Sequence, residues 1–192
     1  MTIDAAFTRF PVLTTERLHL RQIQPQDAEA LFAILSDEEA MRYYGHEPQR
    51  SLDETHALIQ QIQERYERRE AIRWGLTFKG EDRLIGTCSF HDFGPGYHRA
   101  ATGYDLNRAY WRRGIMTEAM SAILTYGFSE LGLHRVEAII DIANEASRNL
   151  LLKLGFTYEG NLRQRYVMGD RFEDEYYFGL LRDEWRGSLE PS

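Results

Sequence analysis

The chain has 192 residues, of which 43% are hydrophobic, enough for one domain with a substantial buried core. Its formal net charge of −7 and the lack of a long basic block argue against a direct nucleic-acid-binding protein. Cys88 is the only cysteine, which excludes an intrachain disulfide, and its apolar strand-like surroundings predict a buried, unreactive thiol. With no signal peptide and no apolar run of membrane-spanning length, we expect no membrane partner and a cytoplasmic location.

The first half of the chain predicts two helices and several strands. Residues 1–13 are expected to form a flexible leader, residues 14–186 a single domain, and residues 187–192 a tail. One helix is expected from Pro25, because proline suits a first helical turn, and another from Ser51, which with Glu54 forms a capping box. Alternating apolar residues predict strands at residues 17–23, 72–78, 84–90 and 99–106. The last three of these strands are expected to form an antiparallel meander.

A strand–loop–helix pattern follows, centred on Gly114. Apolar residues recur at helical spacing after this glycine, so a helix is expected to begin there. A helix N-terminus offers free backbone N–H groups and the positive end of the helix dipole, which suits a phosphate. Gly114 would let the backbone approach such a ligand, and Arg112 and Arg113 add positive charge. An ordinary strand-to-helix turn with two solvated arginines explains the same residues.

The second half of the chain predicts a crossover and a hairpin. A strand at residues 134–142 follows the helix, and this order normally makes a right-handed crossover between parallel strands. Asn144 is expected to cap another helix, and residues 156–168 and 172–182 to form a hairpin. Together these elements predict an α/β (α+β) fold with a mixed, mostly antiparallel seven-stranded sheet and about four helices.

Six short motifs occur along the chain in a definite order. They are Thr15-Glu16-Arg17-Leu18, Gly103-Tyr104, Tyr110-Trp111-Arg112-Arg113-Gly114-Ile115-Met116-Thr117-Glu118-Ala119, Asn144-Glu145-Ala146-Ser147, Leu154-Gly155-Phe156 and Leu180-Leu181-Arg182-Asp183-Glu184-Trp185. Their order and spacing resemble the GNAT superfamily of acyl-CoA-dependent N-acetyltransferases. Within it the chain is most similar to the branch of the ribosomal-protein (alanine/serine) N-terminal acetyltransferases. The resemblance covers about residues 14–185.

This resemblance implies acetyl-CoA as the cofactor, bound in a slot where the 99–106 and 134–142 strands splay apart. Its pyrophosphate would lie on the Gly114 loop, held mainly by backbone N–H groups, and strand N–H groups would polarise its thioester carbonyl. Met116 stands where the family usually has Gly or Ala. The cofactor-binding residues that the resemblance implies are Tyr104, Asp105, Leu106, Arg112, Arg113, Gly114, Ile115, Met116, Thr117, Asn144 and Asn149.

The resemblance also implies Ser147 as the catalytic residue, donating a proton to the departing thiolate. The tyrosine that many GNAT enzymes use for this purpose is replaced here by Leu151. Both Asn144 and Ser147 have a second interpretation, as an ordinary helix cap and a first-turn helical serine.

The general base stays unassigned from the sequence. The positions where the family often carries a glutamate are occupied here by Ala101 and Tyr166. The candidates that remain are Asp105, His91 and Glu47, each of which can equally be a solvated or structurally paired group.

The acceptor is expected to be a primary amine. Tyr43 and Tyr44 follow the first predicted helix, where the family builds its acceptor site, so they are the candidate substrate contacts, although aromatic residues commonly serve the core. The N-terminal α-amine of a protein, such as a ribosomal protein, is the expected acceptor. A small amine (polyamine, amino sugar or antibiotic) and a non-catalytic acyl-CoA sensor are the alternatives. No metal is expected, and the chain would be a monomer or homodimer.

Overall fold

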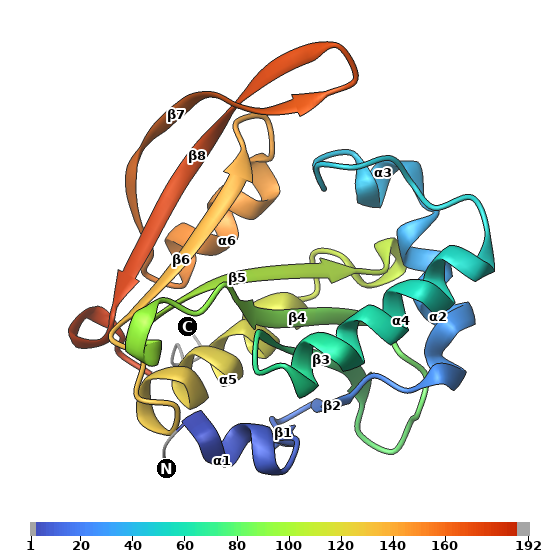
Figure 1. Ribbon diagram of the computed structural model, residues 1–192, viewed down its shortest axis with the longest axis horizontal. Coiled ribbons are helices and arrows are strands. Elements are labelled where there is room, and N and C mark those ends of the chain that lie inside the picture. Colours follow the sequence, from blue (N-terminus) through green and yellow to red (C-terminus); the bar gives the residue numbers. More distant parts are fainter. Residues whose placement is uncertain (1–2, 188–192) are drawn as a thin grey trace.

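The computed structural model describes residues 3–187, in which a mixed sheet of eight strands is flanked by six α-helices (Figure 1). The strands are β1 (Leu13–Thr14), β2 (Leu18–Gln22), β3 (Ala71–Phe78), β4 (Gly86–His91), β5 (Arg99–Leu106), β6 (Arg135–Asp141), β7 (Thr157–Met168) and β8 (Arg171–Leu181). The helices are α1 (Ile3–Thr8), α2 (Ala28–Leu35), α3 (Glu38–Met41), α4 (Leu52–Glu67), α5 (Ile115–Ser129) and α6 (Glu145–Lys153).

The structure corrects the predicted count of seven strands and about four helices. The added strand is β1, only two residues long, in which Leu13 pairs with Leu20 of β2. The added helices α1 and α3 have six and four residues, too few for a helical period to be visible in the sequence. Helix α1 lies within the segment expected as a leader: Ala6 is buried, and its carbonyl accepts a hydrogen bond from the Tyr66 hydroxyl at 2.6 Å.

The sheet order β1-β2-β3-β4-β5-β6-β8-β7 positions the site. All neighbouring strands are antiparallel except β5 and β6, which confirms both the predicted meander and the parallel crossover. β5 and β6 pair only from Arg99–Arg135 to Ala101–Glu137, and beyond that point they diverge (Figure 1). Among residues 3–187 the later half of β5 therefore has one edge without a strand partner, and this is the predicted splay.

Hydrophobic residues pack on both faces of the sheet. Trp74 of β3 and Phe90 of β4 are buried in the main core with α5, whereas Ile23 and Leu31 belong to a second cluster that α2 and α4 cover. Cys88 is fully buried, which raises the pKa of its thiol and confirms the predicted buried cysteine. Within residues 3–187, no helix is both long and apolar enough to cross a membrane.

Candidate functional site

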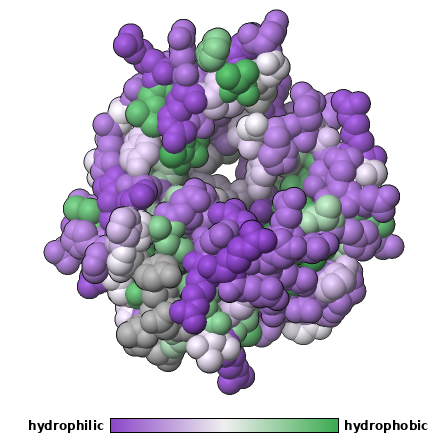
Figure 2. Space-filling model, in the orientation of Figure 1, coloured by the Kyte–Doolittle hydropathy of each residue, from purple (hydrophilic) through white to green (hydrophobic). Residues whose placement is uncertain are grey.

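A cavity of about 470 Å³ lies where β5 and β6 part. One wall is β5 from Ala101 to Asp105, the opposite wall is the end of β6 from Ala138 to Asp141, and residues of α3 and α4 close one side. The space-filling view shows the surface hollowed between helix α3 and the β7–β8 hairpin (Figure 2). The divergence of the two strands thus leaves an open site rather than a packed core.

The loop that leads from β5 into α5 turns sharply at two residues with left-handed backbone conformations. These are Arg112, with φ +59°, and Gly114, with φ +72°. Helix α5 then begins at Ile115 without a side-chain cap. Ile115 and Met116 are buried in the core, so the large side chain of Met116 does not cover the loop. The first turn of α5 therefore offers backbone N–H groups beside the open end of the splay.

A carboxylate at the start of α5 ties this loop to a segment near the N-terminus. Glu118 of α5 accepts hydrogen bonds from the Thr15 hydroxyl at 2.5 Å, the Arg17 backbone N–H at 2.8 Å and Arg17 Nε at 2.6 Å. Burial raises the pKa of Glu118, but these bonds outweigh it and hold the pKa below its ordinary value. Arg17 also donates to the Arg113 carbonyl at 3.0 Å. The Thr15–Leu18 motif and the Tyr110–Ala119 motif, about a hundred residues apart in sequence, are therefore in direct contact.

Tyr104, Ser147 and Asn144 meet on the core side of β5. The Tyr104 hydroxyl lies 2.5 Å from the buried Ser147 Oγ, and burial raises the pKa of Tyr104 to about 12. Asn144 Oδ1 accepts a hydrogen bond from the Ser147 backbone N–H at 3.0 Å, so Asn144 is the N-cap of α6, and it also lines the cavity. Asn149 is exposed on α6 outside the cavity lining, and Leu151 is fully buried.

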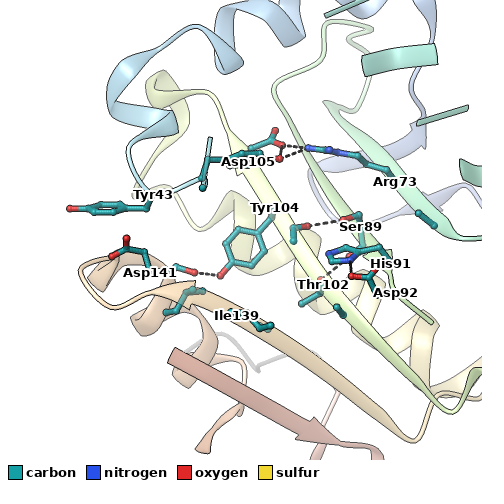
Figure 3. A pocket seen from close by; sticks show the side chains of 18 of the residues that line it. Tyr43, Arg73, Ser89, His91, Asp92, Thr102, Tyr104, Asp105, Ile139 and Asp141 are labelled. Carbon is teal, nitrogen blue, oxygen red and sulfur yellow. Dashed lines mark hydrogen bonds and ion pairs between the residues drawn. The ribbon is translucent and has the colours of Figure 1, made fainter. Parts of the chain in front are cut away.

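A buried polar cluster lies on the other face of β5 (Figure 3). Asp105 Oδ2 accepts hydrogen bonds from Arg73 Nη2 at 2.5 Å, from Thr87 Oγ1 at 2.6 Å and from the Tyr44 hydroxyl at 3.3 Å. Arg73 also donates to the Tyr44 hydroxyl at 2.7 Å, and burial raises the pKa of Tyr44. Asp105 Oδ1 is buried without a hydrogen-bond partner among the described residues. Such an oxygen is costly to leave unpaired and suits a donor from a bound molecule.

Among the base candidates, His91 and Asp105 line the cavity, whereas Glu47 is exposed and lies outside its lining. At the two positions where a glutamate is common in the family, Ala101 lies in the wall, and the Tyr166 hydroxyl donates to Asp141 Oδ2 at 2.6 Å. The structure thus reduces the candidate bases to two.

The remaining predicted residues take different places. Tyr43 and Tyr44 both line the cavity, and Tyr43 lies across its mouth from Asp141 (Figure 3). The Leu106 carbonyl accepts a hydrogen bond from Trp111 Nε1 at 2.8 Å, which ties the end of β5 to the loop. Thr117 is partly buried in the first turn of α5.

Two polar lining residues were missed from the sequence. Arg73 and Ser89 occupy positions that alternate with the buried apolar residues of β3 and β4. Because the strands were recognised by their apolar face, the opposite face was left out. A row of charged and hydroxyl side chains between core residues was the available signal.

Comparison with known proteins identifies the family. An acetyltransferase (GNAT) domain matches residues 17–157. The uncharacterized N-acetyltransferase YoaA of Bacillus subtilis (strain 168) is 44% identical over 88% of this chain and 96% of its own length. The [ribosomal protein uS5]-alanine N-acetyltransferase of Escherichia coli (strain K12) is 26% identical over 90% of this chain and 92% of its own.

Two solved structures with bound coenzyme A share the fold. RimL, a ribosomal L7/L12 α-N-protein acetyltransferase, superposes with a TM-score of 0.80 at 21% identity, covering 89% of this chain and 98% of RimL. The spermidine N-acetyltransferase of Vibrio cholerae, in complex with coenzyme A and spermine, has a TM-score of 0.76 at 20% identity, covering 87% and 96%. With the splayed sheet and the extent of the domain match, these findings show that the chain belongs to the GNAT family of N-acetyltransferases, which use acetyl-CoA as the acetyl donor.

Proposed function

We propose that this enzyme acetylates the N-terminal α-amine of a peptide or protein, and that the transfer takes place in the cavity between β5 and β6. Acetyl-CoA supplies an activated thioester, whose acetyl group passes directly to the amine. The geometry fits this donor, because the unpaired edge of β5 and the first turn of α5 both present backbone N–H groups along the splay. No covalent acyl-enzyme is proposed, since the one cysteine is buried in the core.

The residues of the splay would divide the work of the transfer. Backbone N–H groups of Tyr104 to Leu106 polarise the carbonyl as negative charge develops on its oxygen. Ser147 donates a proton to the departing thiolate, and the Tyr104 hydroxyl, 2.5 Å from Ser147 Oγ, stabilises the serine oxygen by a hydrogen bond as the proton leaves. Arg112 and Arg113, with the backbone of Gly114 to Thr117, hold the pyrophosphate.

One observation carries the choice of acceptor: the carboxylates that line the cavity already have partners. Asp105 is bound by Arg73, Asp141 by the Tyr166 hydroxyl, Glu175 by Arg165 at 2.9 Å and Asp92 by Arg65 at 3.5 Å. A polyamine carries several separated charges and needs several free anionic groups. Arginines already pair three of these four carboxylates, which leaves Asp141 and the Oδ1 of Asp105, unpaired among the described residues, to receive a single cationic group. A single amine on an otherwise neutral peptide backbone suits this lining better.

The acidity of the amine supports the same choice. An attacking amine must be neutral, and about a fifth of an α-amine is neutral at about pH 7.4, against about one part in a thousand of a lysine amine. With no carboxylate at Ala101 or Tyr166, the site is better matched to the more acidic ammonium group. The ribosomal-protein relatives support an α-amine, while the spermidine enzyme keeps a small amine as the second candidate.

The experiment compares three acceptors with the purified enzyme and acetyl-CoA at pH 7.4. One peptide has a blocked N-terminus and a free lysine, a second has a free N-terminus and a blocked lysine, and spermidine is the third. We expect the second peptide to be acetylated fastest, as measured by mass spectrometry. Faster acetylation of the lysine peptide would refute the choice, and a comparable or higher rate on spermidine would favour a small amine. A peptide blocked at both amines is the matched control for background hydrolysis.

A further inference from the structure

His91 of β4 faces the cavity over a gap in the neighbouring strand. Its partners on β5 are small: His91 pairs with Ala101, and a Cβ atom added at Gly103 would lie only 3.6 Å from His91 Nε2. No side chain of β5 therefore separates this nitrogen from the unpaired edge of the strand, where the thioester is proposed to lie. The His91 side chain is partly buried, with 29% of its surface accessible to solvent.

Asp92 sets the orientation of the His91 ring. Asp92 Oδ2 lies 3.0 Å from His91 Nδ1 (Figure 3), and a carboxylate can only accept, so Nδ1 carries the proton and Nε2 is left as the acceptor. Asp92 has a left-handed backbone, with φ +49°, and its other oxygen lies 3.5 Å from Arg65 Nη2 of α4. A strained backbone and an ion pair from a second element thus converge on the residue that holds the ring.

The surroundings keep the imidazole neutral and able to take up a proton. Burial lowers the pKa of His91 below its ordinary value, and Asp92 raises it only in part. The charged groups that face the ring from the neighbouring elements, Arg65 of α4 and Arg73 of β3, lower its pKa further. Because Arg73 is paired with Asp105, that carboxylate does not compete as a base.

We propose that His91 is the general base of the acetyl transfer, taking a proton from the acceptor ammonium through Nε2, with Asp92 as its positioning residue. The neutral amine then forms the N–C bond as the C–S bond breaks. The departing sulfur takes the proton of Ser147, the second proton of the nitrogen replaces that serine proton by way of solvent, and the proton on His91 is released to solvent. This inference rests on the proposed function, because it names the base for the same amine.

The pH profile of His91→Ala tests the assignment. In wild type, kcat/KM for a free-N-terminus peptide should reach its plateau near the pKa of His91, below that of the amine. In the variant the amine must be neutral beforehand, so kcat/KM should keep rising until about pH 8. Since only about 3% of an α-amine is neutral at pH 6.5, the loss there should be at least about thirtyfold and should shrink to a few-fold at pH 9. Profiles of the same shape would overturn the proposal.

Two controls separate a base from a structural residue. Imidazole added to His91→Ala should restore part of the rate at pH 6.5, and a lack of rescue together with an unchanged profile would refute the role. His56→Ala removes an exposed histidine of α4 outside the cavity and should behave as wild type. Coenzyme A affinity, measured by calorimetry, should be unchanged in His91→Ala.

Asp92→Asn tests the positioning role, since asparagine tolerates the left-handed backbone and keeps the size of the side chain. We expect kcat to fall at least tenfold at pH 6.5 with KM within about threefold of wild type; an unchanged kcat would overturn the role of Asp92. If wild type releases coenzyme A without acetylating any α-amine, the proposed function fails as well. If wild type acetylates the peptide and His91→Ala matches it at every pH, only the base assignment fails.

Discussion

Gly114 offers the sharpest test of how the loop holds the donor. Its φ of +72° lies in the left-handed region, and a Cβ atom built there would meet only Arg17 Nη2 at 3.5 Å, an ordinary contact. Substitution therefore adds no severe clash. Asparagine and aspartate both tolerate this backbone region better than other residues, so they form a matched pair that differs in charge. Gly114→Asn measures the effect of bulk, and Gly114→Asp adds a carboxylate where the pyrophosphate is proposed to lie.

The magnitude follows from the charges. At an effective dielectric constant of about 20, two like unit charges about 5 Å apart repel by about 3 kcal/mol. Solvent at the open end of the splay and the neighbouring Arg17 reduce this value. A tenfold weaker affinity, about 1.4 kcal/mol, is therefore the least that we expect for aspartate relative to asparagine.

The assay is isothermal titration calorimetry of each variant with coenzyme A at low and high salt. The difference between the two variants should shrink at high salt, because exposed charges are then screened. Circular dichroism and thermal melting establish that both variants fold. If folded Gly114→Asp and Gly114→Asn bind coenzyme A equally well at low salt, the loop does not hold the pyrophosphate.

Three further predictions concern side chains at or beside the splay. Ser147→Ala should lower kcat by about 10²-fold or more while coenzyme A affinity stays near wild type, and a loss below about threefold would leave the serine a helical role only. Glu118→Gln should lower Tm at pH 7. Because folding lowers the pKa of Glu118, its carboxylate stabilises the fold above the unfolded pKa of about 4.3, and this stabilisation is lost as the pH falls through the folded pKa. The Tm values of wild type and Glu118→Gln should therefore converge in acid, and a constant difference would contradict this. Arg73→Met should destabilise the fold by about 3–5 kcal/mol in urea unfolding, and adding Asp105→Asn should recover part of it; equal stability of Arg73→Met and wild type would refute the ion pair.

The fold was predictable where the local signal was long. β5 was expected at residues 99–106 and is Arg99–Leu106. Ser51 caps α4 as predicted, since its hydroxyl oxygen accepts a hydrogen bond from the Glu54 backbone N–H, while the Glu54 carboxylate accepts from the Ser51 hydroxyl. Of the elements that were missed, β1 and α1 are held by contacts with distant segments rather than by a period of their own. Pairing with β2 and burial of Ala6 decide them, and neither is visible in the local sequence.

The site was predictable in part for a related reason. Backbone features such as the Gly114 turn and the Asn144 cap depend on local residue types, and both are present. The bond between Asp105 and Arg73 joins strands that are not direct neighbours, β5 and β3, across β4. Only the register of three strands places these residues on one face, so this pairing could not be inferred from the sequence. The resemblance supplied the order of motifs but not the partners of the side chains.

The alternation of side chains along β5 gives the proposed mechanism its geometry. Tyr104 points toward Ser147 of α6, whereas Gly103 and Asp105, its neighbours in sequence, face His91 and Arg73 on the opposite side. The proposed proton donor and the proposed base therefore lie on opposite faces of one strand, and the strand edge that would hold the carbonyl lies between them. This arrangement suits a direct transfer, because the base reaches the attacking amine and the proton donor reaches the departing sulfur from separate sides of the strand edge. One residue of register slip in β5 would exchange the two faces, which is why its pairing with β4 from Gly86–Leu106 to His91–Ala101 matters for the chemistry as well as for the fold.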